Sequence, residues 1–232
     1  EISACLVGSE MCIRDRSLEA KIMFEKNIGD GIYTTNEQFK KAGLEESERN
    51  ECLQNSDLII SNQPLQEEEL NLLKPGSTLL GMVDPFNNQS MLNFCSERKI
   101  NVVSMEFIPR ITRAQKMDVL SSQANLAGYV AVIESAKYLS SALPMMMTAA
   151  GTLKPARVFV IGVGVAGLQA IATAKRLGAR VEAFDTRDVV EEQVNSLGAK
   201  FVKIDLGVTG QTDQGYAKEL TPEQIQKQKD LQ

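Results

Sequence analysis

The sequence has 232 residues, of which 43% are hydrophobic and 24% are charged, as expected for a globular protein with one large or two modest α/β domains. A net charge of −5 argues against a nucleic-acid-binding surface. The sequence contains no run of about 18 apolar residues, which is the length that would indicate a membrane span. The chain has no histidine. Its cysteines lack metal-binding or redox spacing, which favours a reducing compartment: Cys5, Cys12, Cys52 and Cys95.

Residues 1–17 (EISACLVGSEMCIRDRS) differ from the rest of the chain, because they show neither a helical nor a strand period. The string CLVGSEMCIRDR looks like translated sequencing-adapter read-through, so we expect this segment to be non-native. The alternative is a genuine but irregular N-terminal segment. Its apolar stretch is too short and too interrupted for a secretory signal peptide.

From Leu18 onward, predicted strands alternate with predicted helices, which indicates βαβ units and a parallel sheet. The predicted helices span residues 35–42, 66–73 and 89–98, and the predicted strands span residues 57–61, 77–83 and 101–105.

An unusually polar segment, residues 106–123, follows the last of these strands. Its Arg110, Gln115, Asp118 and Ser121 can all form hydrogen bonds, and ligands bind beyond the carboxyl ends of parallel strands. These side chains could hold the nicotinamide end of a dinucleotide, or they could form an interdomain salt-bridge and capping network. The residue types leave both interpretations open.

The next predicted element is a long, mostly apolar helix over residues 117–143, with a potential interruption near Gly128 and an end before Pro144. We expect it to carry the chain from a first α/β unit to a second one. We interpret the Met145–Met147 run that follows as core filling rather than as a flexible wall beside a cofactor.

Arg157–Ile161 is predicted to be a fully buried parallel strand, and the glycines after it have the spacing of a dinucleotide-binding turn. Gly162 would permit the tight turn, Gly164 would let the backbone approach a pyrophosphate, and Gly167 would let the next helix pack closely. The N-terminus of that helix offers N–H groups to phosphates. The predicted cofactor-binding residues of this turn are Gly162, Val163, Gly164, Val165, Ala166 and Gly167.

Asp185 ends a second predicted strand, where a carboxylate accepts hydrogen bonds from ribose hydroxyls and repels a 2′-phosphate. This favours NAD(H) over NADP(H). Thr186 and Arg187 are counted with the same site. Arg187 could pair with a 2′-phosphate, but we interpret it as a solvated loop charge. The alternative for the whole motif is a glycine-rich turn that serves packing only.

Residues 157–205 supply three strands and two helices, which make one mononucleotide-binding half. A charged helix over residues 221–232 ends the chain. The sequence thus predicts an α/β protein with two Rossmann-like parallel-sheet domains joined by a long helix, both truncated. The expected divisions are residues 1–17 (non-native), 18–122 (N-terminal α/β domain) and 123–232 (incomplete Rossmann domain).

The absence of histidine bears on the reaction class, because dehydrogenases of alcohols and hydroxy acids need a proton acceptor and often use histidine. Lysine or tyrosine can substitute, so that class is less favoured but still open. Direct passage of hydride between two nicotinamides needs no such group.

The chain closely resembles one family. Residues 106–175, with EFIPRITRAQKMDVLSSQANLAGY and GVGVAGLQAIATAKRLGA, are similar to the NAD(H)-binding first domain of the proton-translocating NAD(P)+ transhydrogenase α subunit. The resemblance runs from Leu18 to Gln232, and its RITRAQxMDxLSSQ motif is more specific than the glycine motif. Residues 1–17 match nothing in the family, whose N-terminal strand is absent or replaced here.

The resemblance implies an enzyme component in which NADH passes hydride directly to NADP+ on a partner. It implies that Arg110, Gln115, Asp118 and Ser121 hold the nicotinamide and its ribose, and that Tyr216 belongs to a mobile loop over residues 207–216 that closes over the nucleotide. The implied partners are an NADP(H)-binding domain or β subunit, a membrane domain that couples transfer to proton translocation, and a second copy in a homodimer. The implied location is the cytoplasmic face of the bacterial inner membrane, or the mitochondrial matrix side in a eukaryote.

Two other function classes stay open. An alanine-dehydrogenase-like enzyme shares the fold, but Lys21, Lys26 and Lys74 sit in no matching catalytic motif. A non-catalytic NAD-binding module would differ only by lacking activity. Because half of the nucleotide-binding fold is absent from the sequence, we expect the chain as written to be weakly stable and to bind nucleotide weakly.

Overall fold

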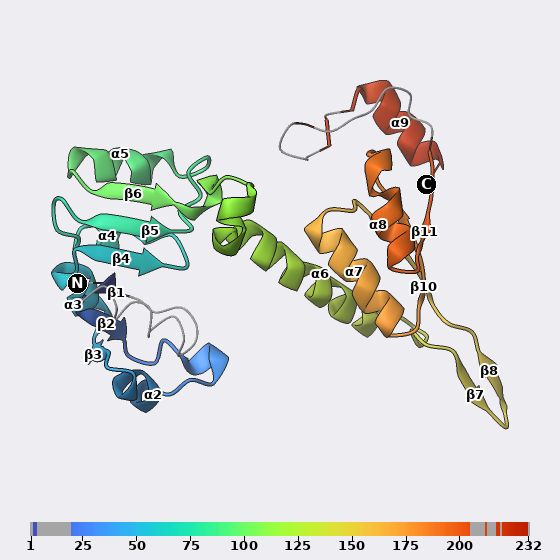
Figure 1. Cartoon of the computed structure of the whole chain (residues 1–232), viewed down its shortest axis with the longest axis horizontal. Helices are drawn as coiled ribbons and strands as arrows, with labels where there is room; N and C mark the ends of the chain where they lie inside the picture. Colours follow the sequence, from blue (N-terminus) through green and yellow to red (C-terminus); the bar gives the residue numbers. More distant parts are fainter. Residues whose placement is uncertain (1, 4–19, 205–211, 213–216, 219, 232) are drawn as a thin grey trace. The chain divides into compact units, whose positions relative to one another are not determined.

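The computed structural model describes residues 2–3, 20–204, 212, 217–218 and 220–231. The chain forms two compact units, Glu1–Pro109 and Arg110–Gln232 (Figure 1). Both units combine helices with parallel strands, so the α/β class predicted from the sequence is confirmed. No helix among the described residues is both long enough and apolar enough to cross a bilayer.

The first unit contains a six-stranded sheet in the order β3-β2-β1-β4-β5-β6, and every neighbouring pair is parallel. Its strands are β1 (Ile2–Ser3), β2 (Ile22–Glu25), β3 (Glu45–Ser47), β4 (Leu58–Ser61), β5 (Thr78–Gly81) and β6 (Asn101–Ser104). Its helices are η1 (Asp30–Ile32), α2 (Asn36–Lys41), α3 (Arg49–Asn55), α4 (Glu67–Leu70), α5 (Gln89–Glu97) and η2 (Met105–Phe107).

The predicted strands β4, β5 and β6 are confirmed, and each is shorter than predicted. Residues 1–17 show no strand period in the sequence, yet Ile2–Ser3 forms β1, which pairs with both β2 and β4. Residues 4–17 lie outside the described residues. The core of this unit is apolar and includes Phe24 and Phe39, whose ring centroids lie 5.0 Å apart.

The second unit contains a three-stranded parallel sheet in the order β11-β10-β9. Its strands are β9 (Arg157–Ile161), β10 (Arg180–Phe184) and β11 (Lys200–Phe201), and a separate antiparallel hairpin pairs β7 (Met146–Thr148) with β8 (Gly151–Leu153). Its helices are η3 (Thr112–Met117), α6 (Val119–Lys137), α7 (Val165–Arg176), η4 (Asp188–Val190), α8 (Glu191–Ser196) and α9 (Pro222–Leu231).

The long helix α6 is continuous, so the interruption that we expected near Gly128 is not present, and the helix ends earlier than predicted. Gly128 instead marks the contact between α6 and α7, which pack side by side (Figure 1). A Cβ atom at Gly128 would overlap the carbonyl oxygen of Ala166. The glycine therefore allows the two helices to approach closely.

Strand β9 is not fully buried, which corrects the sequence-based prediction. Val158 and Val160 pack against a core that includes Val132 and Ile171, whereas Phe159 and Ile161 are 42% and 60% exposed. Among the described residues β9 pairs only with β10, and one of its faces is uncovered. An apolar run is typical of a strand covered on both faces, but it does not guarantee that both covers are present.

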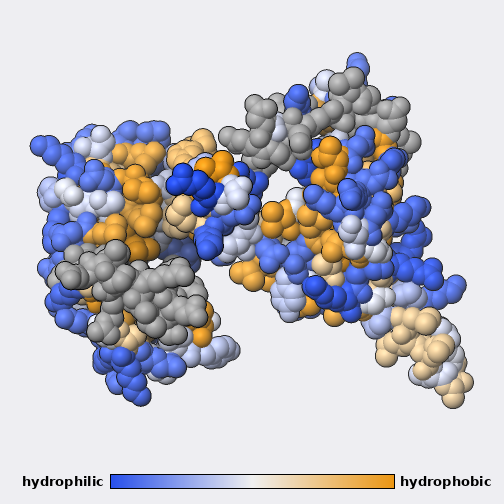
Figure 2. Space-filling model, viewed as in Figure 1, coloured by the Kyte–Doolittle hydropathy of each residue, from blue (hydrophilic) through white to orange (hydrophobic). Residues whose placement is uncertain are grey.

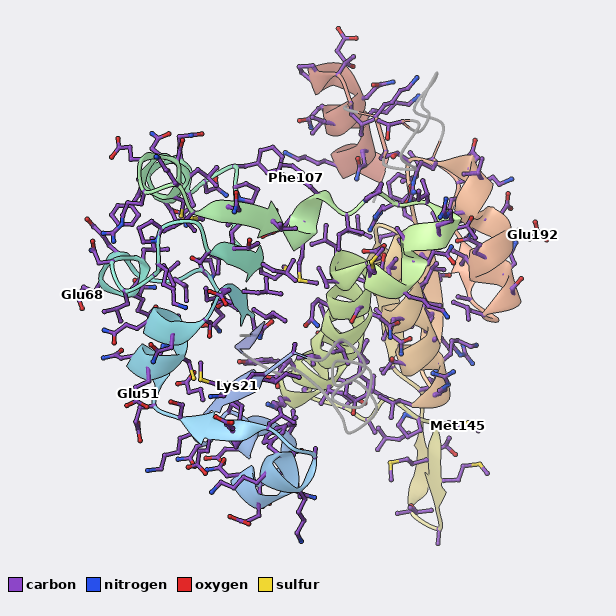
Figure 3. All side chains as sticks on the ribbon, turned by 60° about the vertical axis from the view of Figure 1, so that its left-hand side comes forward. Lys21, Glu51, Glu68, Phe107, Met145 and Glu192 are labelled. Atoms are coloured by element: carbon purple, nitrogen blue, oxygen red, sulfur yellow. The ribbon has the colours of Figure 1, made fainter. Side chains whose placement is uncertain are left out.

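The hairpin β7–β8 corrects the core-filling interpretation of Met145–Met147. These three side chains are 57%, 50% and 73% exposed. Met146 and Met147 lie opposite Leu153 and Thr152 in a two-stranded ribbon whose residues are all exposed. The ribbon is coloured as a mildly hydrophobic projection in Figure 2, and Met145 is labelled at its base in Figure 3.

Candidate functional site

The turn between β9 and α7 has the conformation that its glycines permit. Gly162 has a φ of +89°, which L-residues rarely adopt, and its N–H donates to the carbonyl oxygen of Phe184 at 2.8 Å. A Cβ at Gly167 would overlap the carbonyl oxygen of Gly162, whereas a Cβ at Gly164 would meet no atom within 4 Å. The outer glycines thus shape the turn, and Gly164 faces open space.

Helix α7 begins directly after this turn, with Gly164 as its N-cap and no side-chain cap. Val165, Ala166 and Gly167 form its first turn, where backbone N–H groups have no partner within the helix. The helix dipole adds partial positive charge at the same place. The turn and the helix N-terminus therefore suit an anion.

Asp185, the residue that follows β10, contacts this turn directly. Its carboxylate accepts a hydrogen bond from the backbone N–H of Val163 at 2.7 Å, and only 8% of the residue is exposed. Burial alone would raise the pKa of Asp185, but hydrogen bonds from Arg187 and from the Val163 backbone outweigh burial. The pKa therefore lies below its ordinary value, and the carboxylate is charged at neutral pH.

Arg187 is not the solvated loop charge that we inferred from the sequence. Its side chain is 13% exposed, and its Nη2 lies 2.9 Å from Asp185 Oδ2. Its Nη2 also donates to the carbonyl oxygen of Val163 at 3.1 Å. Thr186 lies half-buried between the two charged residues. Two residues of separation along the chain allow this local pairing, which the sequence pattern did not reveal.

A second polar cluster lies at the N-terminus of α6. Asp118 caps the helix by accepting the Ser121 N–H at 2.9 Å, and it also accepts the Ser121 hydroxyl at 2.6 Å. Arg110 Nη2 donates to Ser121 Oγ at 3.3 Å, and Arg110 Nε lies 3.8 Å from Asp118 Oδ2. The hydroxyl and backbone N–H of Ser121 hold the pKa of Asp118 below its ordinary value. The structure thus brings three of the four predicted residues together.

The fourth, Gln115, is exposed in η3, and no side-chain hydrogen bond joins it to the described residues. Tyr216, the last of the predicted cofactor-binding residues, lies outside the described residues, as does almost all of the segment 207–216. Gly128 was interpreted from the sequence as a potential break in the long helix, whereas it is the point at which α6 packs closely against α7.

The two clusters lie toward the same end of the second unit. The C-terminal half of α6 runs beside β9, and the Leu143 carbonyl accepts the N–H of Ala156, just before β9, at 3.1 Å. Helix α6 therefore runs opposite to β9, and its N-terminus extends toward the carboxyl end of the strand. From Gly128, at the contact with α7, to Ser121 the helix rises about 10 Å.

This arrangement offers an anion site, a buried carboxylate and a group of hydrogen-bonding side chains along one end of a parallel sheet. Ligands of open α/β folds bind beyond the carboxyl ends of the strands.

The first unit has its own polar contact at the carboxyl ends of two strands. Glu106 accepts the Asp84 N–H at 2.8 Å and the Ser104 hydroxyl at 2.6 Å, which ties together the ends of β5 and β6.

Two family models match the chain in succession. The "Alanine dehydrogenase/PNT, N-terminal domain" matches residues 14–127, and the "Alanine dehydrogenase/PNT, C-terminal domain" matches residues 131–231.

Among curated proteins, the first part of NAD(P) transhydrogenase subunit alpha of Rhodospirillum rubrum is 46% identical over 216 residues, which cover 90% of this chain and 56% of that protein. NAD(P) transhydrogenase subunit alpha of Haemophilus influenzae is 41% identical over 202 residues, covering 87% of this chain and 39% of that protein. The chain therefore spans about half the length of the curated relatives it matches, or less.

Among solved structures, the transhydrogenase of Sinorhizobium meliloti superposes with a TM-score of 0.83 at 40% identity, covering 88% of this chain and 62% of that chain. An L-alanine dehydrogenase superposes with a TM-score of 0.75 at 16% identity, covering 86% of this chain and 56% of that one, which is a likeness of fold alone. The resemblance noted from RITRAQxMDxLSSQ and the glycine motif is confirmed at the level of the family.

Proposed function

The chain belongs to the alanine dehydrogenase/PNT family and is homologous to transhydrogenase α subunits, and we propose that its second unit binds NADH and passes hydride directly to NADP+ on a partner domain. The observation that carries this proposal is the pairing of Asp185 with the glycine turn. The buried carboxylate bonds the Val163 backbone at 2.7 Å and thereby fixes the turn above it.

In this proposal each part of the site holds a different part of the dinucleotide. The N–H groups at the start of α7 bind the pyrophosphate, since they combine free donors with partial positive charge. Asp185 accepts the ribose hydroxyls of the adenosine half and disfavours a 2′-phosphate. The charged state of Asp185, favoured by its lowered pKa, suits this role.

Arg110, Gln115, Asp118 and Ser121 are proposed to hold the nicotinamide and its ribose. Asp118 orients Ser121 through two hydrogen bonds and lies near Arg110, so three polar groups are already preorganised. Gln115 is exposed and available to a ligand. Tyr216 is proposed to close over the bound nucleotide.

When bound, NADH would supply the hydride, and the residues of this chain would act by positioning it. Holding two nicotinamides at near-attack distance and excluding water accelerates transfer without a protein acid or base. This agrees with a sequence that has no histidine. The proposed partner is an NADP(H)-binding domain or β subunit.

The complete assembly is proposed to be a homodimer of this component with a membrane domain that couples transfer to proton translocation. We place it at the cytoplasmic face of a bacterial inner membrane, or on the matrix side in mitochondria. The names of the transhydrogenase relatives as α subunits support an assembly of several subunits.

The amino-acid dehydrogenase alternative finds no support in the lysines considered for it. Lys21 pairs with Glu45 at 2.8 Å, Lys26 pairs with Glu48 at 3.7 Å, and Lys74 pairs with Asp57 at 3.1 Å. All three lysine side chains are at least 40% exposed, as is typical of surface ion pairs. A non-catalytic NAD-binding module is separated from the proposal by activity alone.

The proposal is tested by titrating the full-length protein with NADH and following the nicotinamide fluorescence. We expect Asp185→Asn and Arg110→Ala each to weaken NADH binding by roughly tenfold or more, because each removes a charge-assisted contact. Asp188→Asn and Lys137→Ala are matched controls, since Asp188 is an exposed carboxylate near Asp185 and Lys137 is an exposed cation at the far end of α6. Equal affinity in all five proteins would contradict the proposed site.

A further inference from the structure

The carboxylate of Asp185 has no acceptor position left for a ligand. Oδ1 accepts the backbone N–H of Arg187 at 2.8 Å and its Nε–H at 2.9 Å. Oδ2 accepts the Val163 N–H at 2.7 Å and Arg187 Nη2 at 2.9 Å. A carboxylate offers about four lone-pair sites, and all four are filled by groups of this chain.

These four donors are of two kinds. The N–H groups of Val163 and Arg187 belong to the backbone and stay wherever the turn and the strand end stay. The Nε and Nη2 groups belong to a side chain with several rotatable bonds, which can leave without any change of fold. Ribose hydroxyls can therefore reach Asp185 only where the Arg187 guanidinium now lies.

We propose that Arg187 is an internal competitor for the ribose subsite and thereby a determinant of nucleotide specificity; this rests on the proposed NAD(H) site. In the nucleotide-free protein the guanidinium occupies the ribose position, bonded to Asp185 and to the Val163 carbonyl. NADH binds only to the fraction of molecules in which the Arg187 side chain has moved away from Asp185. The apparent dissociation constant for NADH equals the intrinsic constant divided by that fraction.

The displaced guanidinium affects the choice between the two nucleotides. It stays tethered two residues from Asp185, beside the ribose that has replaced it. A guanidinium is a bidentate partner for phosphate and accommodates a 2′-phosphate in related folds. Arg187 therefore weakens NADH binding while partly offsetting the repulsion of Asp185 toward NADPH.

The test compares NADH and NADPH affinities of the full-length protein and its Arg187→Ala variant. We expect Arg187→Ala to bind NADH about tenfold more tightly, as loss of a charge-assisted contact in the nucleotide-free state implies, and NADPH less tightly. Arg176→Ala is the control, because Arg176 is an exposed arginine at the end of α7. Unchanged or weaker NADH binding by Arg187→Ala would overturn the competition.

A second measurement does not depend on a variant. The Arg187 Nε–H resonance in the wild-type protein should be protected from solvent exchange without nucleotide and lose that protection at saturating NADH. Persistent protection would overturn the displacement. The Asp185→Asn variant distinguishes failure of the nucleotide site from failure of the competition. If Asp185→Asn binds NADH as tightly as the wild type, the nucleotide site itself is rejected. If Asp185→Asn loses NADH affinity while Arg187→Ala gains none, only the competition is rejected.

Discussion

Gly128 in α6 lies directly against the carbonyl oxygen of Ala166 in the first turn of α7, with no room for a side chain between them. This contact joins the two parts of the candidate site. Ala166 belongs to the turn of helix that follows the glycine loop, and α6 carries Asp118 and Ser121 at its N-terminus. The spacing between the proposed pyrophosphate and nicotinamide subsites therefore depends on how closely these helices pack.

We predict that Gly128→Ala destabilises the protein, even though alanine is the better helix former by about 1 kcal/mol. The added methyl would overlap backbone, which cannot move aside as a flexible side chain can, and overpacking of this kind costs roughly 1–3 kcal/mol. Urea unfolding measures the effect. Gly31→Ala is the control, because a Cβ there meets no atom within 4 Å; equal stability of the two variants would refute the close contact.

Gly162 and Gly164 are predicted to separate folding from binding. Gly162→Ala should cost about 1–2 kcal/mol of unfolding free energy, because φ is +89° there. Gly164→Ala should cost less than Gly162→Ala, since its φ is −86° and its Cβ would face open space, so that the only loss is that of a glycine N-cap. The same variant should weaken NADH binding, because a methyl would occupy the approach of the pyrophosphate. Thermal melts and NADH titrations of both variants check this pair.

Local features were the ones that the sequence predicted well. The capping box at α2 is present, with Thr35 accepting the Gln38 N–H and Gln38 accepting the Thr35 N–H. Thr221 starts α9 in the same way with Gln224. The starts of the helices predicted over residues 35–42 and 221–232 thus depend on residues only three positions apart, so the local pattern of side chains determines where these helices begin.

Features that depend on distant elements were predicted less well. The apolar run of β9 indicated burial, but Ile161 is 60% exposed because no described element covers that face. Gly128 was predicted as a helix interruption, since the sequence alone does not reveal that Ala166 packs against it. The hydrogen bonds from Arg187 to the Asp185 carboxylate were missed, because a charge pattern in the sequence does not show which way a side chain points.

Asp118 is predicted to stabilise α6 as its N-cap. Asp118→Ala should cost about 1 kcal/mol, the usual effect of losing a capping side chain. Ser121→Ala should cost less, because the Ser121 backbone N–H still donates to Asp118. Guanidinium unfolding of the two variants ranks these effects. A larger loss in Ser121→Ala than in Asp118→Ala would contradict the capping role.

The Asp185 carboxylate gives a prediction for acid stability. Its pKa is lower in the folded protein than its ordinary value, so the unfolded state binds the proton more readily. The stabilisation is therefore fully present above the unfolded pKa of about 3.9 and is lost as pH falls through the lower folded value. The gap in unfolding free energy between wild type and Asp185→Asn should be constant from pH 7 to pH 5 and shrink below pH 4. A constant gap down to pH 3 would refute it.

We propose that one NADH is held across both clusters for direct transfer to a second nicotinamide. The most direct measurement uses NADH carrying deuterium at the transferred position, mixed with the full-length protein, its NADP(H)-binding partner and NADP+. We expect the deuterium to appear in NADPH and not in water, and we expect Asp185→Asn and Arg110→Ala to slow its appearance. Deuterium released to solvent, or NADH formed from NAD+ and alanine without any partner, would contradict it.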